Sequence, residues 1–204
     1  MKTFRKYLNL FCISLGASCI FKLAMIKDVY YDDMQAAFNA TNVQMGLLTA
    51  FFAITQALAY LPGGWLVDLV PVKYLMPVGL IGTGLLGFWE ATFPSYEVLL
   101  VIQMGYGLVI TLMFWDAMIK GTRMLAADHA QGKIFGMLEG VRGACATAAS
   151  FGSVWFFAKL GEGMSGLRSV MIYYSVILCT VGVLVFLFME KNEVEGKVNA
   201  KLAL

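Results

Sequence analysis

Charged residues are scarce in this chain, and histidine is almost absent. Asp, Glu, Lys and Arg make up 14% of the 204 residues, against about 25% in an average soluble domain. His129 is the single histidine, so a histidine-based metal site or catalytic triad is not expected. The formal net charge of +2 is spread between apolar runs and forms no basic patch. We therefore expect no metal centre, no cofactor and no nucleic-acid partner.

Cysteines are few and show no functional spacing. Each of the four lies inside an apolar run, and no two have the spacing of a metal site. We interpret them as small packing residues rather than as a disulfide framework. They are Cys12, Cys19, Cys145 and Cys179.

Long apolar runs, by contrast, occupy most of the chain. Hydrophobic residues amount to 60%, and the mean hydropathy is +0.76. Six runs are each long enough, at about 1.5 Å per helical residue, to cross a hydrocarbon core of about 30 Å. They are residues 7–26, 45–67, 74–93, 97–119, 134–158 and 169–189. We predict an all-α integral membrane bundle of six transmembrane helices in residues 1–189. Residues 190–204 are predicted to form a short cytoplasmic tail or linker stub.

Lysine and arginine are distributed unevenly between the two sides of these spans, which predicts an orientation. With the N-terminus inside, ten of them lie in cytoplasmic segments and three in outer segments. The ten are Lys2, Arg5, Lys6, Lys73, Lys120, Arg123, Lys133, Lys191, Lys197 and Lys201, and the three are Lys27, Lys159 and Arg168. We therefore expect both termini in the cytoplasm and the chain in the plasma membrane, which is the inner membrane in a bacterium.

Small residues recur every fourth position along the fifth span. This stripe consists of Gly132, Gly136, Gly140, Ala144, Ala148 and Gly152. Such spacing forms a smooth surface on which another helix backbone can approach closely. The stripe is interpreted either as packing within the chain or as a contact with a second copy or another chain.

The end of the second span carries a more specific pattern. Gly64 is followed after three residues by Asp68, and then by a turn that contains Lys73. This resembles the sequence between the second and third helices of the major facilitator superfamily, although Leu69 and Pro71 stand where that motif has a base and a glycine. The resemblance implies a gating motif of Gly64, Asp68 and Lys73. A carboxylate at a helix end can bind a nearby base, for which Arg123 is the candidate.

The resemblance also implies what the chain is for. The family's carriers have twelve helices in two halves, each of two three-helix repeats, and bind solute between the halves. Six spans therefore resemble an amino-terminal half. Such a half would transport a small solute only together with a second copy or another chain, which would contact it at the stripe. The alternatives are a non-transporting assembly subunit or an inactive truncated remnant. An intramembrane serine protease is not expected, because His129 falls in a predicted cytoplasmic loop.

Ionisable groups inside spans are costly and are candidates for a substrate site. Glu139 and Arg142 lie three residues apart on the fifth span and are expected to share a face and to pair. Lys22 resembles the first-helix cation of the family's anion carriers, although it could instead extend to the headgroups. Gln103 lies where the family often has an arginine and joins the candidates without that charge. Together they predict an anionic or sugar-like solute.

Two further charges lie near span ends. Glu90 closes the third span and Asp116 lies near the end of the fourth. A charged side chain close to the membrane boundary can extend to the aqueous surface. We therefore expect Glu90 to reach the outer surface and Asp116 the inner one.

Overall fold

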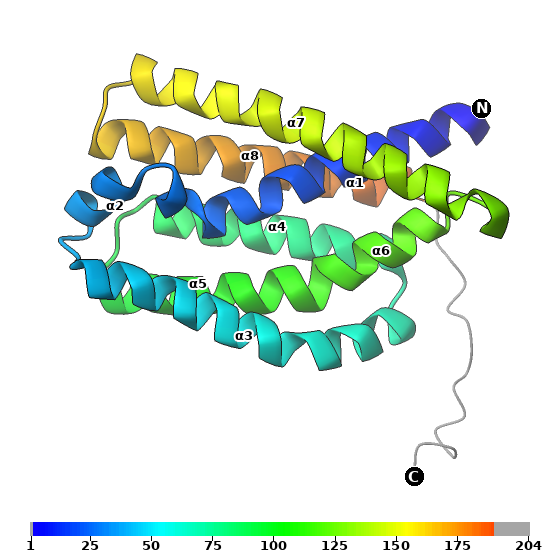
Figure 1. Cartoon of the computed structure of the whole chain (residues 1–204), viewed down its shortest axis with the longest axis horizontal. Helices are drawn as coiled ribbons and strands as arrows, with labels where there is room; N and C mark the ends of the chain where they lie inside the picture. Colours follow the sequence, from blue (N-terminus) through cyan, green and yellow to red (C-terminus); the bar gives the residue numbers. More distant parts are fainter. Residues whose placement is uncertain (1, 190–204) are drawn as a thin grey trace, which may run out of the picture.

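The protein is helical throughout residues 2–189, which are the residues that the computed structural model describes (Figure 1). No strand occurs in this range, and the predicted tail of residues 190–204 lies outside it. The elements in chain order are α1 (Lys2–Ala24), η1 (Ile26–Asp28), α2 (Tyr31–Ala37), α3 (Asn42–Leu69), α4 (Val72–Glu90), α5 (Tyr96–Val109), η2 (Ile110–Trp115), α6 (Asp116–Arg123), η3 (Asp128–Ala130), α7 (Gln131–Lys159) and α8 (Met164–Phe188). The prediction of an all-α membrane bundle is confirmed.

Within residues 2–189, five helical segments are long and apolar enough to cross a membrane. They are Phe4–Ala24, Asn42–Leu69, Val72–Glu90, Tyr96–Arg123 and Met164–Phe188, of which Tyr96–Arg123 joins α5, η2 and α6 in one rod. α7 has 29 residues but is not among them, since its sequence combines charged side chains with many Gly and Ala. It nevertheless lies along the bundle against α1 and α8 (Figure 1).

Helix α1 lies inside the bundle, whereas α3 lies at its edge. In the spanning part of α1, 67% of residues are buried, compared with 28% in α3. α1 contacts α4, α7 and α8, and it therefore holds together the two sides of the molecule (Figure 1).

Close helix contact in the core depends on glycines. A Cβ atom added to Gly84 of α4 would lie 2.6 Å from Cys179 Sγ and 2.9 Å from the Ser175 carbonyl oxygen of α8. The backbones of α4 and α8 therefore approach each other as small residues allow in membrane bundles.

Local sequence signals determine both ends of α3. Thr41 accepts a hydrogen bond from the Gln44 amide, and the Gln44 side chain accepts one from the Thr41 amide at 2.8 Å. This reciprocal capping box starts the helix. At the other end, Pro71 occupies the N-cap position of α4, so that a two-residue turn separates the helices and fixes Asp68 beside it.

Three short elements, η1, α2 and η2, were not predicted. The connection between α1 and α3 folds into η1 and the seven-residue α2. The fourth span contains the π-helix η2 in its middle. A π-helix changes the phase of all later residues on the rod, and it is a frequent feature of functional sites.

Candidate functional site

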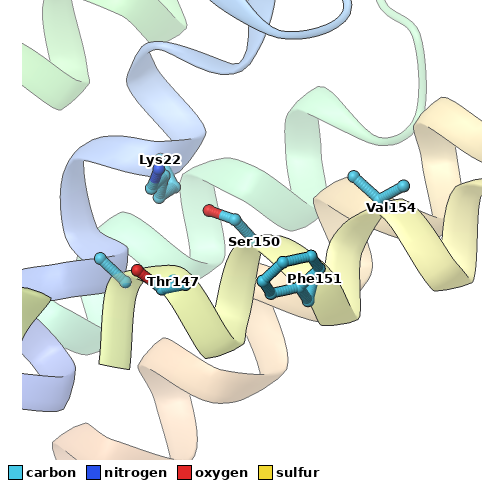
Figure 2. Close-up of a pocket in the computed structure, with 6 residues that line it drawn as sticks. Lys22, Thr147, Ser150, Phe151 and Val154 are labelled. Carbon is cyan, nitrogen blue, oxygen red and sulfur yellow. The ribbon is translucent and has the colours of Figure 1, made fainter. Parts of the chain in front are cut away.

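A groove of about 370 Å³ lies between α1 and α7. Figure 2 shows Lys22 of α1 facing the α7 residues Thr147, Ser150, Phe151 and Val154. Thr147 and Ser150 are three residues apart, so their hydroxyl groups lie on one face of α7. The groove thus combines one cation, two hydroxyls and an apolar wall.

Lys22 has no hydrogen-bond or ion-pair partner among the described residues, and its side chain is half-buried. Lys27, five residues further along, instead binds Asp28 at 2.9 Å. Because Lys22 lies in the last turn of α1, the partial negative charge of the helix end favours its ammonium group. It also lines a second cavity of about 160 Å³, beside Tyr30 and Tyr174. The ammonium charge is therefore available to a ligand in either space.

Glu139 and Arg142 form the ion pair that their spacing predicts. Arg142 donates to Glu139 Oε2 at 2.5 Å. The Arg142 side chain is 32% exposed and the Glu139 side chain is 53% exposed. They occupy the open face of α7, where a Cβ on Gly140 or Gly143 would meet nothing within 4 Å. Neither residue lines the groove of Lys22. The pair is neutral overall, so the charge of the groove comes from Lys22.

Gln103 lies apart from these residues. Its side chain is 2% exposed on the buried face of α5, and it lines neither of the cavities that contain Lys22. The structure instead adds Thr147 and Ser150, which were not predicted. Their spacing of three on the helix that carries the stripe was a usable signal, since hydroxyl groups at that spacing share a face.

Asp68 binds a base, but not the one that was predicted. Lys120 donates to Asp68 Oδ1 at 2.8 Å and to the Val67 carbonyl at 3.1 Å, which ties the end of α3 to α6. Arg123 is exposed one turn later, and its carbonyl accepts a hydrogen bond from Gln131. The candidate pair of Asp68 and Arg123 is therefore wrong in this conformation. We call the Asp68–Lys120 contact the inner latch.

The other motif residues are also redistributed. Gly64 is exposed and has open space around it, whereas a Cβ on Gly63 would lie 3.0 Å from Asp116 Oδ2. Gly63 rather than Gly64 is thus the close-approach position. Lys73 lies over the ring of Phe186 at 5.8 Å and is not part of the inner latch.

Glu90 does not reach a surface as predicted, whereas Asp116 is only partly covered. Glu90 is completely buried and accepts a hydrogen bond from Tyr106. Asp116 is half-buried, and its Oδ2 atom is enclosed beside Gly63. The expectation for Glu90 is wrong because α5 packs over its carboxyl group. The expectation for Asp116 stays a prediction, since α3 covers one of its oxygen atoms and the residue is partly exposed.

A serine with a Gly-x-Ser-Gly sequence, Ser165, begins α8, but it cannot meet the single histidine. His129 lies in η3 before α7, and Ser165 follows α7. The 29 residues of α7 separate them by about 43 Å at 1.5 Å per residue. This distance rules out the nucleophile–base contact that serine catalysis requires.

Comparison with known proteins agrees with this architecture. The chain is 30% identical over 191 residues to inner membrane protein YqcE and 29% identical over 201 residues to inner membrane protein YihN, both of Escherichia coli K12. These alignments cover 93% and 98% of this chain but 45% and 48% of the relatives. It is also 29% identical over 139 residues to quinolone resistance protein NorA of Staphylococcus aureus, which covers 66% of this chain and 33% of that protein.

The chain thus spans about half the length of the curated relatives that it matches. No solved structure matches it significantly. The model of the Major Facilitator Superfamily, however, matches residues 7–203. This match covers nearly every residue of the helical bundle described above, and the chain belongs to the major facilitator superfamily.

Proposed function

We propose that this protein forms one six-helix half of a carrier for a small anionic or sugar-like solute. Membership in the family supports a role in transport across a membrane, and the apolar helices and inner-membrane relatives support a multi-pass location in a bacterial inner membrane. The observation that carries the solute class is Lys22, an unpaired cation in a groove of about 370 Å³.

The groove favours anions over cations. A half-desolvated ammonium group interacts with a charged ligand much more strongly than it would in water. Thr147 and Ser150 add hydroxyl groups that accept or donate hydrogen bonds to a polyhydroxy solute (Figure 2). Lys22, the charged residue that lines the groove, would repel a cationic drug, so we do not extend to this chain the drug resistance that NorA's name describes.

A second six-helix unit would complete the solute path, with α7 as the sixth crossing of this half. In lipid, the exposed Glu139–Arg142 pair would face hydrocarbon, which is costly for charged groups. Contact with protein or with a water-filled path removes that cost. The same face of α7 is open at Gly136 and Gly140, where another backbone can approach. These features support a partner at α7, provided by a second copy or by another chain.

A thermal-shift screen of the purified chain in detergent tests the solute class. We would use inorganic phosphate, gluconate, glucose 6-phosphate and glucose as probes. A ligand at 100 times its Kd stabilises the folded state by about 2.7 kcal/mol, which is measurable. We expect at least one anion to raise Tm in wild type and in K27Q, whose lysine already binds Asp28, but not in K22Q.

Two results would contradict the proposal. An anion-induced shift that persists in K22Q would place the anion elsewhere. Absence of any shift with all four probes would instead favour a membrane assembly subunit that transports nothing.

A further inference from the structure

Glu90 and Tyr106 form an enclosed polar pair at one end of the bundle. Both side chains are completely buried, and the Tyr106 hydroxyl donates to Glu90 Oε2 at 2.7 Å. The other carboxyl oxygen, Oε1, has no hydrogen-bond partner. Tyr106 is a neutral donor, so this contact supplies no positive charge.

The chain's own helices enclose this pair. α4 packs against α8 and α1 one turn before Glu90, because a Cβ on Gly87 would meet Leu23 of α1 at 2.5 Å and would also contact the Ser175 side chain of α8. Tyr106 comes from α5. The burial of Glu90 therefore does not depend on a second six-helix unit.

Arg168, at the start of α8, is a cation that contacts the residue next to Glu90. Its Nε–H donates to the Ala91 carbonyl at 3.1 Å, and its guanidinium lies over the Phe93 ring at 5.1 Å. Ala91 directly follows Glu90, but no ion pair joins Arg168 to the Glu90 carboxyl group.

Among the described residues, the helices around Glu90 contribute no ion-pair partner to it. On α1, Lys22 lines the groove with α7, and Cys19 is buried near it. On α5, Glu97 lies in the first turn. On α8, Tyr173 and Tyr174 pack toward α7 through Phe156 and the Ala149 carbonyl.

An ionised carboxylate in this position would be desolvated and would face a single neutral donor. Such a buried charge costs far more than one hydrogen bond returns, whereas a protonated carboxyl group is tolerated. The enclosure of Glu90 is thus the geometry of a carboxyl group that holds a proton.

We infer that Glu90 is a proton-binding site, protonated while α4, α5 and α8 are closed and released when this end opens. On release, the proton leaves Glu90 Oε1 for external water. The Arg168 guanidinium then breaks its hydrogen bond to the Ala91 carbonyl and forms an ion pair with the Glu90 carboxylate. The coupling of this step to solute movement rests on the proposed transport function.

Infrared spectroscopy of the whole chain in lipid tests the protonation directly. A neutral carboxyl group absorbs separately from a carboxylate. We expect E90Q to lose a neutral-carboxyl band at neutral pH, and E97Q, which changes the glutamate in the first turn of α5, to keep it. Should E90Q fail to fold, Y106F must shift the same band, since it removes the hydrogen bond alone. An E90Q spectrum with the full band, or an unshifted band in Y106F, would overturn the site.

Amide hydrogen exchange tests the opening without any solute. After correction for the intrinsic effect of pH, we expect exchange at residues 88–94 and 164–170 to increase severalfold in alkaline buffer in wild type but not in E90Q. Equal increases in both proteins would overturn the coupling of proton release to opening. Failure of every solute probe above would refute the proposed function and leave both of these readouts intact.

Discussion

The charge balance along α7 sets the charge that a ligand meets at Lys22. Arg142 neutralises Glu139 about five residues before Thr147, so Lys22 acts without a nearby competing carboxylate. Removing Arg142 would leave Glu139 free to attract the Lys22 charge or to repel an anion. The ion pair thus affects the groove without lining it.

We expect R142A to weaken the anion response about two- to tenfold, because one uncompensated charge in a medium of intermediate dielectric changes binding by about that much. E139Q is the matched control. It leaves the Arg142 cation without its carboxylate, so the anion-induced rise in Tm should be preserved or strengthened. For both variants, the response is measured as the concentration of gluconate or phosphate that gives half of the maximal Tm shift. A stronger response in R142A than in E139Q would contradict the argument.

The inner latch should make a small but specific contribution to stability. Its side chains are 25% exposed for Lys120 and 60% for Asp68, and exposed ion pairs contribute about 0.2–1 kcal/mol. A double-mutant cycle of D68N and K120M, measured by detergent unfolding, should give a coupling energy in that range. The matched cycle of D68N with R123M should give a coupling near zero. A coupling energy between Asp68 and Arg123, with none between Asp68 and Lys120, would instead support the Asp68–Arg123 pair predicted from the sequence.

These residues show which contacts the sequence could predict. Glu139 and Arg142 are three residues apart on one helix, where local geometry alone brings them together. The partner of Asp68 depends on the phase of the fourth span, and the π-helix changes that phase by about 100° for one extra residue. The burial of Glu90 depends on how α5 packs, which no local pattern reveals.

The packing of α3 against α5 requires a particular small residue. A Cβ added to Gly107 would lie 2.6 Å from the Phe52 carbonyl oxygen, which is backbone and cannot move aside. G107A should therefore destabilise the bundle by about 1–3 kcal/mol, as overpacking usually does. G46A on α3, where the added atom meets nothing within 4 Å, should be neutral or slightly stabilising. Detergent unfolding measures both, and equal stabilities would show that the helices do not pack as described.

At the scale of elements, the long helices follow from hydropathy and the short ones do not. Each of the five candidate spans is a long helical segment because lipid leaves no partner for an unpaired backbone amide. α2 and η1 lie outside that constraint, in a connection whose fold depends on contacts such as the Tyr31 hydroxyl with Asn42 at 3.0 Å. Hydropathy likewise cannot predict the π-helix, since the same six residues would fit an α-helix equally well.

The orientation of the whole molecule remains a prediction from its lysines and arginines. We expect a fluorescent protein fused after residue 204 to fluoresce in the cytoplasm, and alkaline phosphatase at the same position to be inactive. Fusions after Gly161, in the connection between α7 and α8, should behave in the opposite way. Alike results at both positions would mean that α8 does not cross the membrane.

The open face of α7 predicts how the molecule associates. Gly136 and Gly140 leave space beside a charged pair that lipid cannot solvate, so a second copy should pack there. Energy transfer between donor- and acceptor-labelled chains in liposomes should reveal association in wild type. G140L should reduce it strongly without changing the stability of the single chain, because the added side chain points into open space.

The matched control for this experiment is V183L, which enlarges an exposed residue of α8. Since lipid solvates both valine and leucine there, association should be unchanged. If wild type shows no energy transfer at any protein density, a second copy is not the partner. If G140L and V183L reduce association equally, the contact does not use the α7 face.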